Sequence, residues 1–333
     1  MSLPKRIALS LPAPTGQVSD TIALAQQAEA LGYDDLWLAD AGGLDALTIT
    51  PMLLEKTERM RVGIAVVPAY TRTPGVLAST LSVIGQAYPG RFVPGLGTSS
   101  HTIIENWHGL KLEKPLTRMR ETVAILRSMM AGEKTDFDGE TLRSRGYRQM
   151  PVENMPIYLA ALRPKMIEAA AEIADGVILN LFPREVLPRI MEHVTIGAER
   201  AGKNPEDVEI VCRHMMVVSE DKETARNAFR GAFASYYSTP VYNKFLAWAG
   251  YEDAANEIRE GWAAKDRERT AAALPDELVD RIAIIGSPDE CRELMRGYAD
   301  GGIHTNIVSC IYPTPEIFEA TVSAFSAENF SFS

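Results

Sequence analysis

Two histidines close together in the chain are the first candidates for chemistry. His101 and His108 flank Trp107 in the segment HTIIENWHG. The ordinary pKa of histidine lets it take up and release protons near neutral pH, so either residue could act as a general acid or base. A histidine that faces solvent or bonds locally is the more common case for either one alone. Both interpretations stay open from these residues.

A carboxylate and a pair of glycines are the next candidates. Asp40 ends the apolar segment DLWLAD, and Gly95 and Gly97 precede Thr98 in the segment GLGT. The carboxylate could orient a ligand ring, or it could simply cap a helix or stabilise a loop. The glycines would let a ligand approach the backbone closely. A plain turn explains the same glycine pattern equally well.

Positive charge is sparse at the places where it could bind an anion. Arg72 and Arg163 each stand near a proline just after an apolar segment, although most surface arginines bind no ligand. The chain has no Ser-His-Asp order and no P-loop. Cys212, Cys291 and Cys310 are far apart, so we expect no metal site and a buried apolar role for each. So few acid–base groups favour a cofactor that performs the reaction while the protein positions it.

The elements that carry these residues follow from one repeating unit. The segment from Arg61 to Gly97 contains an apolar run, a helical pattern and a second apolar run. This order predicts two parallel strands joined by a helix, in a sheet buried on both faces. The same alternation predicts strands at 6–11, 35–39, 61–67, 91–95, 156–160, 176–180, 208–218 and 302–309, and a last helix at 313–325.

Eight strands alternating with helices predict an α/β fold of the (β/α)8 TIM-barrel type. We expect one domain over residues 1–333, with insertions near 132–155 and 220–274. The first insertion should contain a small hairpin, and the second should be helical throughout. The alternative is a doubly wound open sheet, which is poorly supported because no Gly-x-Gly-x-x-Gly follows the first strand.

Composition limits the partners of the chain. Its 333 residues include 34 basic and 44 acidic side chains, which give a net charge of −10. That charge argues against a general nucleic-acid surface. No apolar run approaches the ~20 residues that span a bilayer, and the N-terminal apolar run is too short for a signal peptide. We therefore expect a cytoplasmic protein that binds a small organic molecule, with no nucleic-acid or membrane partner.

A barrel of this type carries its active site at the carboxyl ends of its strands. That rule selects candidates without any motif. They are Leu11 to Thr15, Asp40, Val66 to Arg72, Gly95 to His101, Ala160 to Arg163, Asn180 to Pro183, His214 and Thr305 to Ser309.

Several collinear segments resemble one known family. They are LGYDDLWLAD, RVGIAVVPAYTRTP, GRFVPGLGT, RMRETVAILRSMMAGE, MPIYLAALRPKMIEAAAEIADGVILN and IIGSPDECRELMRGYADGGI. Together they resemble the bacterial luciferase-like superfamily, on the branch that uses the deazaflavin coenzyme F-420. The pattern of methylene-tetrahydromethanopterin reductase is the most similar that we recognise. The family's fold is a (β/α)8 barrel with insertions, which agrees with the strand count.

The resemblance also implies where a deazaflavin would bind. The peptide between Ala65 and Val66 falls where the family has a cis non-prolyl bond that bulges under the ring. Asp40 falls where the family has an acid that contacts the ring. Gly97 and Thr98 fall on the loop that lines the ring and the ribityl chain.

The family's phosphate loop falls on Ala160, Ala161, Leu162 and Arg163, just before a predicted helix. A helix N-terminus favours an anion, which supports this assignment. The chain departs from the family pattern at two places. The first bears on the cofactor's identity, and the second bears on the acid–base chemistry. The loop is glycine-rich in the reductase, whereas it reads Ala-Ala-Leu-Arg here. Many deazaflavin relatives have a histidine after the strand-two aspartate, where this chain has Ala41.

The resemblance implies an oxidoreductase that transfers a hydride between coenzyme F-420 and an organic substrate. The substrate would lie over the exposed ring face, between the loop after strand four and the second insertion. We expect Tyr70 and Trp107 to contact it, and His101 or His108 to act as the catalytic acid or base. Asn180, at the end of strand six, completes the expected cofactor residues.

Two other functions remain open from the sequence. The same scaffold binds FMN in monooxygenase relatives, which a separate reductase supplies with reduced flavin. A flavin-binding barrel without turnover is consistent with the missing histidine. The resemblance also implies a homodimer.

Overall fold

The computed structural model describes residues 3–311 and 314–332. In this part of the chain the main sheet has nine strands, and a further pairing between β8 and β9 closes all of them except β10 into a barrel. Every pairing in the barrel is parallel. The barrel strands are β1 (Arg6–Leu11), β2 (Asp35–Leu38), β3 (Arg61–Pro68), β4 (Phe92–Gly97), β7 (Tyr158–Ala160), β8 (Gly176–Asn180), β9 (Glu209–Val218) and β11 (Thr305–Cys310). The predicted (β/α)8 barrel is confirmed.

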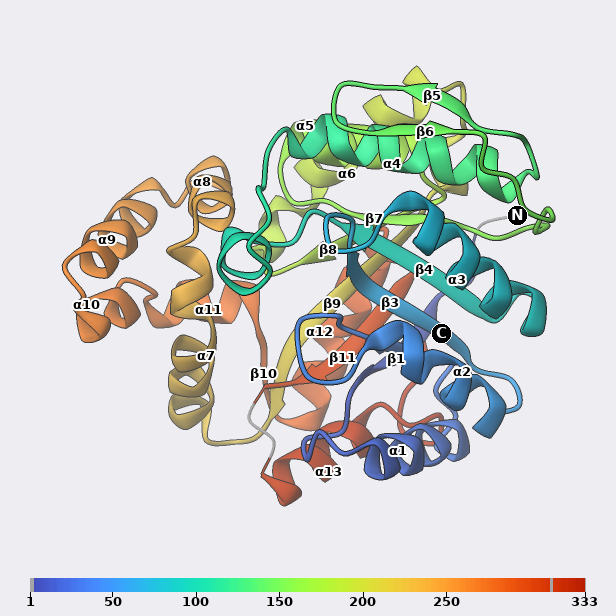
Figure 1. Cartoon of the computed structure of the whole chain (residues 1–333). Coiled ribbons are helices and arrows are strands. Elements are labelled where there is room, and N and C mark those ends of the chain that lie inside the picture. The colour runs from blue at the N-terminus through green and yellow to red at the C-terminus, as the bar shows by residue number, and fades with distance from the viewer. Residues whose placement is uncertain (1–2, 312–313, 333) are drawn as a thin grey trace.

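An outer layer of helices covers the barrel (Figure 1). It consists of α1 (Val18–Ala30), α2 (Ala46–Lys56), α3 (Pro74–Ala87), α4 (Pro115–Met130), α5 (Pro164–Ile173), α6 (Leu187–Arg200), α12 (Pro288–Asp300) and α13 (Pro315–Ala324). Local sequence sets several helix starts. Ser287 and Glu290 form a capping box before α12, with Pro288 in the first turn. Pro313, where the last helix was predicted to begin, lies outside the described residues.

Two insertions interrupt the regular alternation. The first carries the predicted hairpin, in which β5 (Asp136–Asp138) pairs antiparallel with β6 (Arg143–Arg145). The second gathers on one side of the barrel (left in Figure 1). It consists of α7 (Lys222–Tyr237), α8 (Pro240–Trp248), α9 (Glu252–Ala263), α10 (Arg267–Ala272) and α11 (Asp276–Ile282). It is helical as predicted and runs past residue 274, to the short strand β10 (Ile284–Gly286). That residues 1–333 form one domain stays a prediction.

The middle of the barrel interior is an apolar layer. It is formed by Ala8, Trp37, Val93, Tyr158, Ile178, Val211 and Ile307. Trp37 fills much of the space, and Gly63 on the neighbouring strand makes room for it. A Cβ at Gly63 would lie 2.5 Å from the Trp37 ring. The barrel is therefore a packed core at this level rather than a channel.

Below that layer, at the amino ends of the strands, lies a buried ionic network. Arg61 Nη2 lies 2.6 Å from Asp35 Oδ2 and 2.8 Å from Glu209 Oε1. The hydroxyls of Tyr158 and Thr305 donate hydrogen bonds to Glu209. Burial alone would raise the pKa of Glu209, but the hydrogen bonds and charge of Arg61 lower it to about 2. Arg61 therefore compensates two carboxylates in a place that excludes water.

The histidine and cysteine predictions have mixed outcomes. Cys212 and Cys291 are buried as expected, and Cys310 is half-buried. His193 has a structural contact in α6, where its Nδ1 lies 3.0 Å from Glu168 Oε1. The expectation that His214 stands at a strand end is wrong, because it lies inside β9, which ends at Val218 as the sequence predicted. No helix within residues 3–311 and 314–332 is long and apolar enough to cross a membrane.

We predict that Arg61→Leu lowers the free energy of unfolding by about 3–5 kcal/mol, because it leaves the buried Glu209 without a counter-charge and Asp35 with only the more distant Arg6. Urea unfolding followed by circular dichroism measures this loss. Arg145→Leu is the matched control, since Arg145 pairs with Asp138 on the exposed hairpin. The control should lose less than about 1 kcal/mol. Equal losses in the two variants would contradict the role given to Arg61.

Candidate active site

The carboxyl ends of the strands form a mouth lined by small and polar residues. Ala65, Val66 and Ala160 are half-buried and pack on top of the apolar middle layer. Asn180 and Arg213 are direct partners in the parallel pairing of β8 and β9. They lie two residues beyond Ile178 and Val211, which point into the barrel, so they point inward as well. The mouth therefore has a small apolar side and a polar side.

The small side is built where β3 meets β4. The peptide between Ala65 and Val66 is cis, as predicted, and the register of β3 against β4 shifts between Ile64 and Val67. A Cβ at Gly97 would lie 2.5 Å from Val66 Cγ2 and 3.4 Å from Ala160 Cβ. Three of the predicted cofactor residues, Val66, Gly97 and Ala160, are thus in one place.

The two glycines of GLGT lie inside β4, which ends at Gly97 rather than at residue 95. Neither has a positive φ angle, so the turn that we considered is wrong. The physical reason for Gly95 is close packing between strands. A Cβ there would lie 2.1 Å from the carbonyl oxygen of Ile64. Thr98 follows the strand, half-buried, and its hydroxyl donates to the Ser99 carbonyl oxygen at 3.4 Å.

Asp40 follows β2 at the mouth and is already paired. Its Oδ2 lies 2.6 Å from Arg72 Nη1, and its Oδ1 accepts a hydrogen bond from the Ala46 amide at 3.4 Å. Arg72 also pairs with Asp45. Two carboxylates therefore neutralise Arg72, so it is not the free anion ligand that the sequence suggested. The bond to the Ala46 amide at the start of α2 agrees with the helix or loop alternative for Asp40, and its contact with a ligand ring stays a prediction.

The predicted phosphate loop leads directly into α5. The Ala161 amide donates to the Ile178 carbonyl at 3.0 Å, which fixes the loop to β8. Leu162 is half-buried, and Arg163 is exposed at the N-cap. No side chain caps this helix start. The amide groups of the first turn and the helix dipole are therefore directed at the loop, which is a suitable site for an anion.

The segment after β4 forms a π-helix, Thr102–Trp107. Trp107 is 58% exposed, and its ring lies 3.3 Å from where a Cβ would stand on Gly42, so it covers the loop that follows Asp40. His101 and His108 are both exposed at the two ends of this helix. Tyr70, after β3, donates its hydroxyl to the Glu113 carbonyl at 2.5 Å, in the segment that follows this helix.

His214 does not face the mouth, although the sequence placed it among the candidates at the strand ends. Its ring lies 4.5 Å from that of Tyr298 on the outer helix α12, and its Nε2 lies 3.0 Å from Asn306 Oδ1. Burial lowers its pKa to about 4, so it is neutral at pH 7. Alternation along β9 explains the error, because the neighbour Arg213 takes the inward position. Arg213 was missed, although a charge inside a predicted buried strand was a usable signal.

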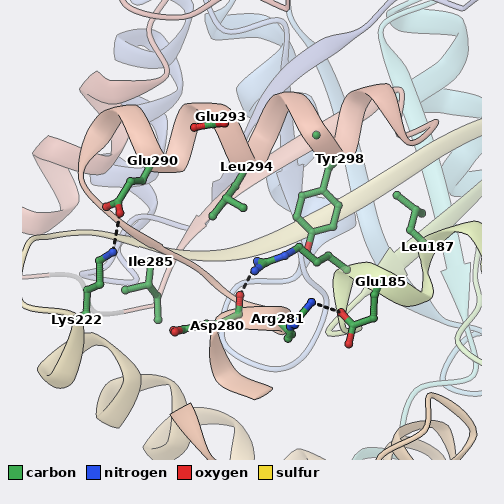
Figure 2. Close-up of a pocket in the computed structure, with 12 residues that line it drawn as sticks. Glu185, Leu187, Lys222, Asp280, Arg281, Ile285, Glu290, Glu293, Leu294 and Tyr298 are labelled. Carbon is green, nitrogen blue, oxygen red and sulfur yellow. Dashed lines mark hydrogen bonds and ion pairs between the residues drawn. The ribbon is translucent and has the colours of Figure 1, made fainter. Parts of the chain in front are cut away.

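A groove of about 790 Å³ lies elsewhere, against α12 and the short turn η2 (Arg184–Val186). Several of its charged side chains are bonded to other residues of the groove (Figure 2). Lys222 Nζ lies 2.7 Å from Glu290 Oε1, and Arg184 Nη1 donates to the Asp280 carbonyl at 2.6 Å. The groove is on the outside of the barrel and contains none of the predicted site residues. We therefore place the candidate site at the mouth.

A family model of the luciferase-like monooxygenases matches residues 1–305 of the chain. The chain belongs to this family. It is 30% identical to the 5,10-methylenetetrahydromethanopterin reductase of Archaeoglobus fulgidus over 288 residues, which cover 85% of this chain and 86% of that protein. It is 27% identical to the same enzyme of Methanolobus tindarius over 300 residues, which cover 89% and 91%.

Solved structures share this luciferase-like fold. The coenzyme F-420-dependent tetrahydromethanopterin reductase of Methanopyrus kandleri superposes with a TM-score of 0.81 at 19% identity, over 97% of this chain and 98% of that one. The oxygenating constituent of 3,6-diketocamphane monooxygenase from Pseudomonas putida, in complex with FMN, superposes with a TM-score of 0.68 at 16% identity, over 98% of each chain.

The mouth of this luciferase-like barrel fits a flat ring with an anionic tail. Val66, Gly97 and Ala160 leave little side-chain volume over the middle layer. The uncapped start of α5 suits a phosphate. The Asn180 Oδ1 atom is buried without a hydrogen-bond partner in the part of the chain that the structure describes, so a ligand donor would satisfy it. These features suit a flavin or a deazaflavin equally.

We predict that Gly97→Ala lowers the free energy of unfolding by about 1–3 kcal/mol, because the added methyl group overlaps Val66. Gly231→Ala is the matched control, since Gly231 lies in α7 and a Cβ there would meet nothing within 4 Å. The control should gain about 0.5–1 kcal/mol from helix propensity. Thermal and urea unfolding measure both changes. A neutral or stabilising effect of Gly97→Ala would show that the mouth is less tightly packed than described.

Proposed function

We propose that the protein is an oxidoreductase that transfers a hydride between coenzyme F-420 and an organic substrate. One structural observation carries the proposal. The bulge at Ala65–Val66 meets Gly97 and Ala160 beside the uncapped start of α5. The likeness to F-420-dependent reductases over most of the chain favours a deazaflavin as the ring bound there.

Different residues of the chain would bind different parts of the cofactor. Val66 and Gly97 would support the ring, with Asp40 and Thr98 beside it. The backbone of residues 160–163 and the first turn of α5 would hold the phosphate. Once bound, the deazaflavin supplies the hydride chemistry, and the protein supplies orientation and exclusion of water.

The substrate would lie over the free ring face, between the π-helix and the second insertion. Trp107 lies on that side because it covers the loop after β2. His101 and His108 carry the exposed imidazoles at the ends of the same helix. We propose that one of them moves the proton that accompanies the hydride, and that Tyr70 contributes through the loop after β3.

FMN is the second candidate cofactor, favoured by the monooxygenase family and by the FMN-bound structure of the same fold. In that case the protein would be a monooxygenase supplied by a separate reductase. The test is to titrate the cofactor-free protein with each cofactor and follow visible absorbance. We expect F-420 to bind at least about tenfold more tightly than FMN, a difference of about 1.4 kcal/mol. Tight binding of FMN alone would replace the proposal with the monooxygenase.

We predict that Asp40→Ala weakens F-420 binding about tenfold, as expected for the loss of one charge-assisted contact, and leaves the melting temperature of the cofactor-free protein almost unchanged. Arg72 keeps its second partner, Asp45, in this variant. Asp45→Ala is the contrasting variant, because Asp45 caps α2. It should lower stability by about 1 kcal/mol and leave F-420 affinity unchanged. Unchanged affinity in Asp40→Ala would remove Asp40 from the site.

We further infer a cytoplasmic homodimer, by likeness to the family. Closed twofold dimers are the commonest assemblies of soluble enzymes. Light scattering during gel filtration should give twice the mass of the chain. A single-chain mass at micromolar concentration would contradict the dimer.

A further inference from the structure

Arg213 is an unpaired cation at the mouth of the barrel. Within residues 3–311 and 314–332 its guanidinium has no hydrogen bond or ion pair, and its Nε is buried without a partner. Arg61, at the other end of the same barrel, has ionic partners, because its guanidinium contacts both Asp35 and Glu209. A buried donor that lacks a partner is costly. Arg213 is therefore placed where a ligand, rather than the protein, would complete its bonding.

Arg213 has other polar groups around it, and one of them also lacks a hydrogen-bond partner. Its strand neighbour Asn180 has the buried and unpartnered Oδ1 atom. Tyr242, on α8 of the second insertion, lies close enough to Asn180 and Arg213 for both to act on its pKa. Burial raises the pKa of Tyr242 to about 12, so its hydroxyl stays protonated at pH 7. The ring of Tyr236, at the end of α7, lies 5.9 Å from that of Tyr242. We call these four residues the Arg213 cluster.

The Arg213 cluster faces the predicted cofactor from across the mouth. Around the closed sheet, β4, β7, β8 and β9 follow β3 in that order, so β9 is the fourth strand from β3 in a barrel of eight. Strands in that relation lie on opposite sides of a closed barrel. A ring held at Ala65–Val66 on β3 therefore has Arg213 across from it. The insertion that carries Tyr236 and Tyr242 lies on the same side as β9, from which its first helix leads.

We propose that the Arg213 cluster binds an anionic oxygen group of the substrate, a carboxylate or a phosphate monoester. This inference rests on the proposed function, because it takes the bound molecule to be the substrate of that hydride transfer. The planar fork of an arginine matches two oxygens of such a group. The free Asn180 Oδ1 accepts a hydrogen bond, so a hydroxyl or amine near the anion would complete the set, and Asn180 then moves from the expected cofactor residues to the substrate side. Because the whole chain is acidic, this local cation selects anionic ligands that the net charge would otherwise repel.

The test uses small probes of matched shape with the F-420-loaded protein. Benzoate and phenyl phosphate carry the two kinds of anion, and benzamide is the neutral counterpart of benzoate. Isothermal titration calorimetry should detect at least one anionic probe and a weaker affinity for benzamide. Arg213→Met and Arg213→Gln should each weaken the anionic probes by about 30-fold or more, the usual effect of removing one partner of a buried charge pair. Arg259→Met on exposed α9 should change nothing.

Several results would overturn the inference. They are failure of both anions to bind wild type, equal affinity for benzoate and benzamide, and unchanged probe affinity in folded Arg213→Gln. A loss of F-420 affinity parallel to the loss of probe affinity would assign Arg213 to the cofactor instead. The same titrations on cofactor-free protein separate the two proposals. Binding of an anion that depends on Arg213, in a protein that does not bind F-420, would support this site and refute the proposed function.

Discussion

The site depends on the close approach of β4 to β3, which only glycine permits at two positions. A Cβ at Gly95 would lie 2.1 Å from the Ile64 carbonyl oxygen, and one at Gly97 would lie 2.5 Å from Val66 Cγ2. The absence of side chains at Gly95 and Gly97 lets the irregular part of β3, between Ile64 and Val67, lie against β4 without a clash. It also leaves that half of the mouth open above the packed middle of the barrel. Any larger residue at either position would push the strands apart and fill the space proposed for the ring.

The barrel interior changes in character from one end to the other. The amino ends of the strands contain a paired ionic network around Arg61, and the middle contains the large rings of Trp37 and Tyr158. The carboxyl ends contain small residues on one side and, on the other, Arg213, which has no partner among the residues that the structure describes. Two arginines in one barrel therefore have opposite roles. Arg61 is paired with the protein's own carboxylates. Arg213 is available to a ligand, at the end where barrels of this type have their active sites.

Local patterns were sufficient to predict most of the fold. Alternating apolar runs and helical spacing located the eight barrel strands, and short alternating segments in a polar stretch indicated the hairpin β5–β6. The errors concern side-chain direction and strand length. The strand before GLGT was ended at Gly95 and Gly97 was assigned to a loop, because the close packing of β4 on β3 that requires these glycines is a long-range contact. His214 was preferred to Arg213 because periodicity in β9 is weak. Tyr242 could not be found, since nothing local shows where an inserted helix meets the barrel.

The most direct test of the account is a crystal structure of the protein with coenzyme F-420 bound. The account predicts the ring against Ala65–Val66, with Gly97 beside it and the phosphate at the start of α5. It also predicts that the Arg213 guanidinium faces the free side of the ring without touching the cofactor. A cofactor seated in the outer groove beside α12, or one whose acidic tail pairs with Arg213, would contradict it.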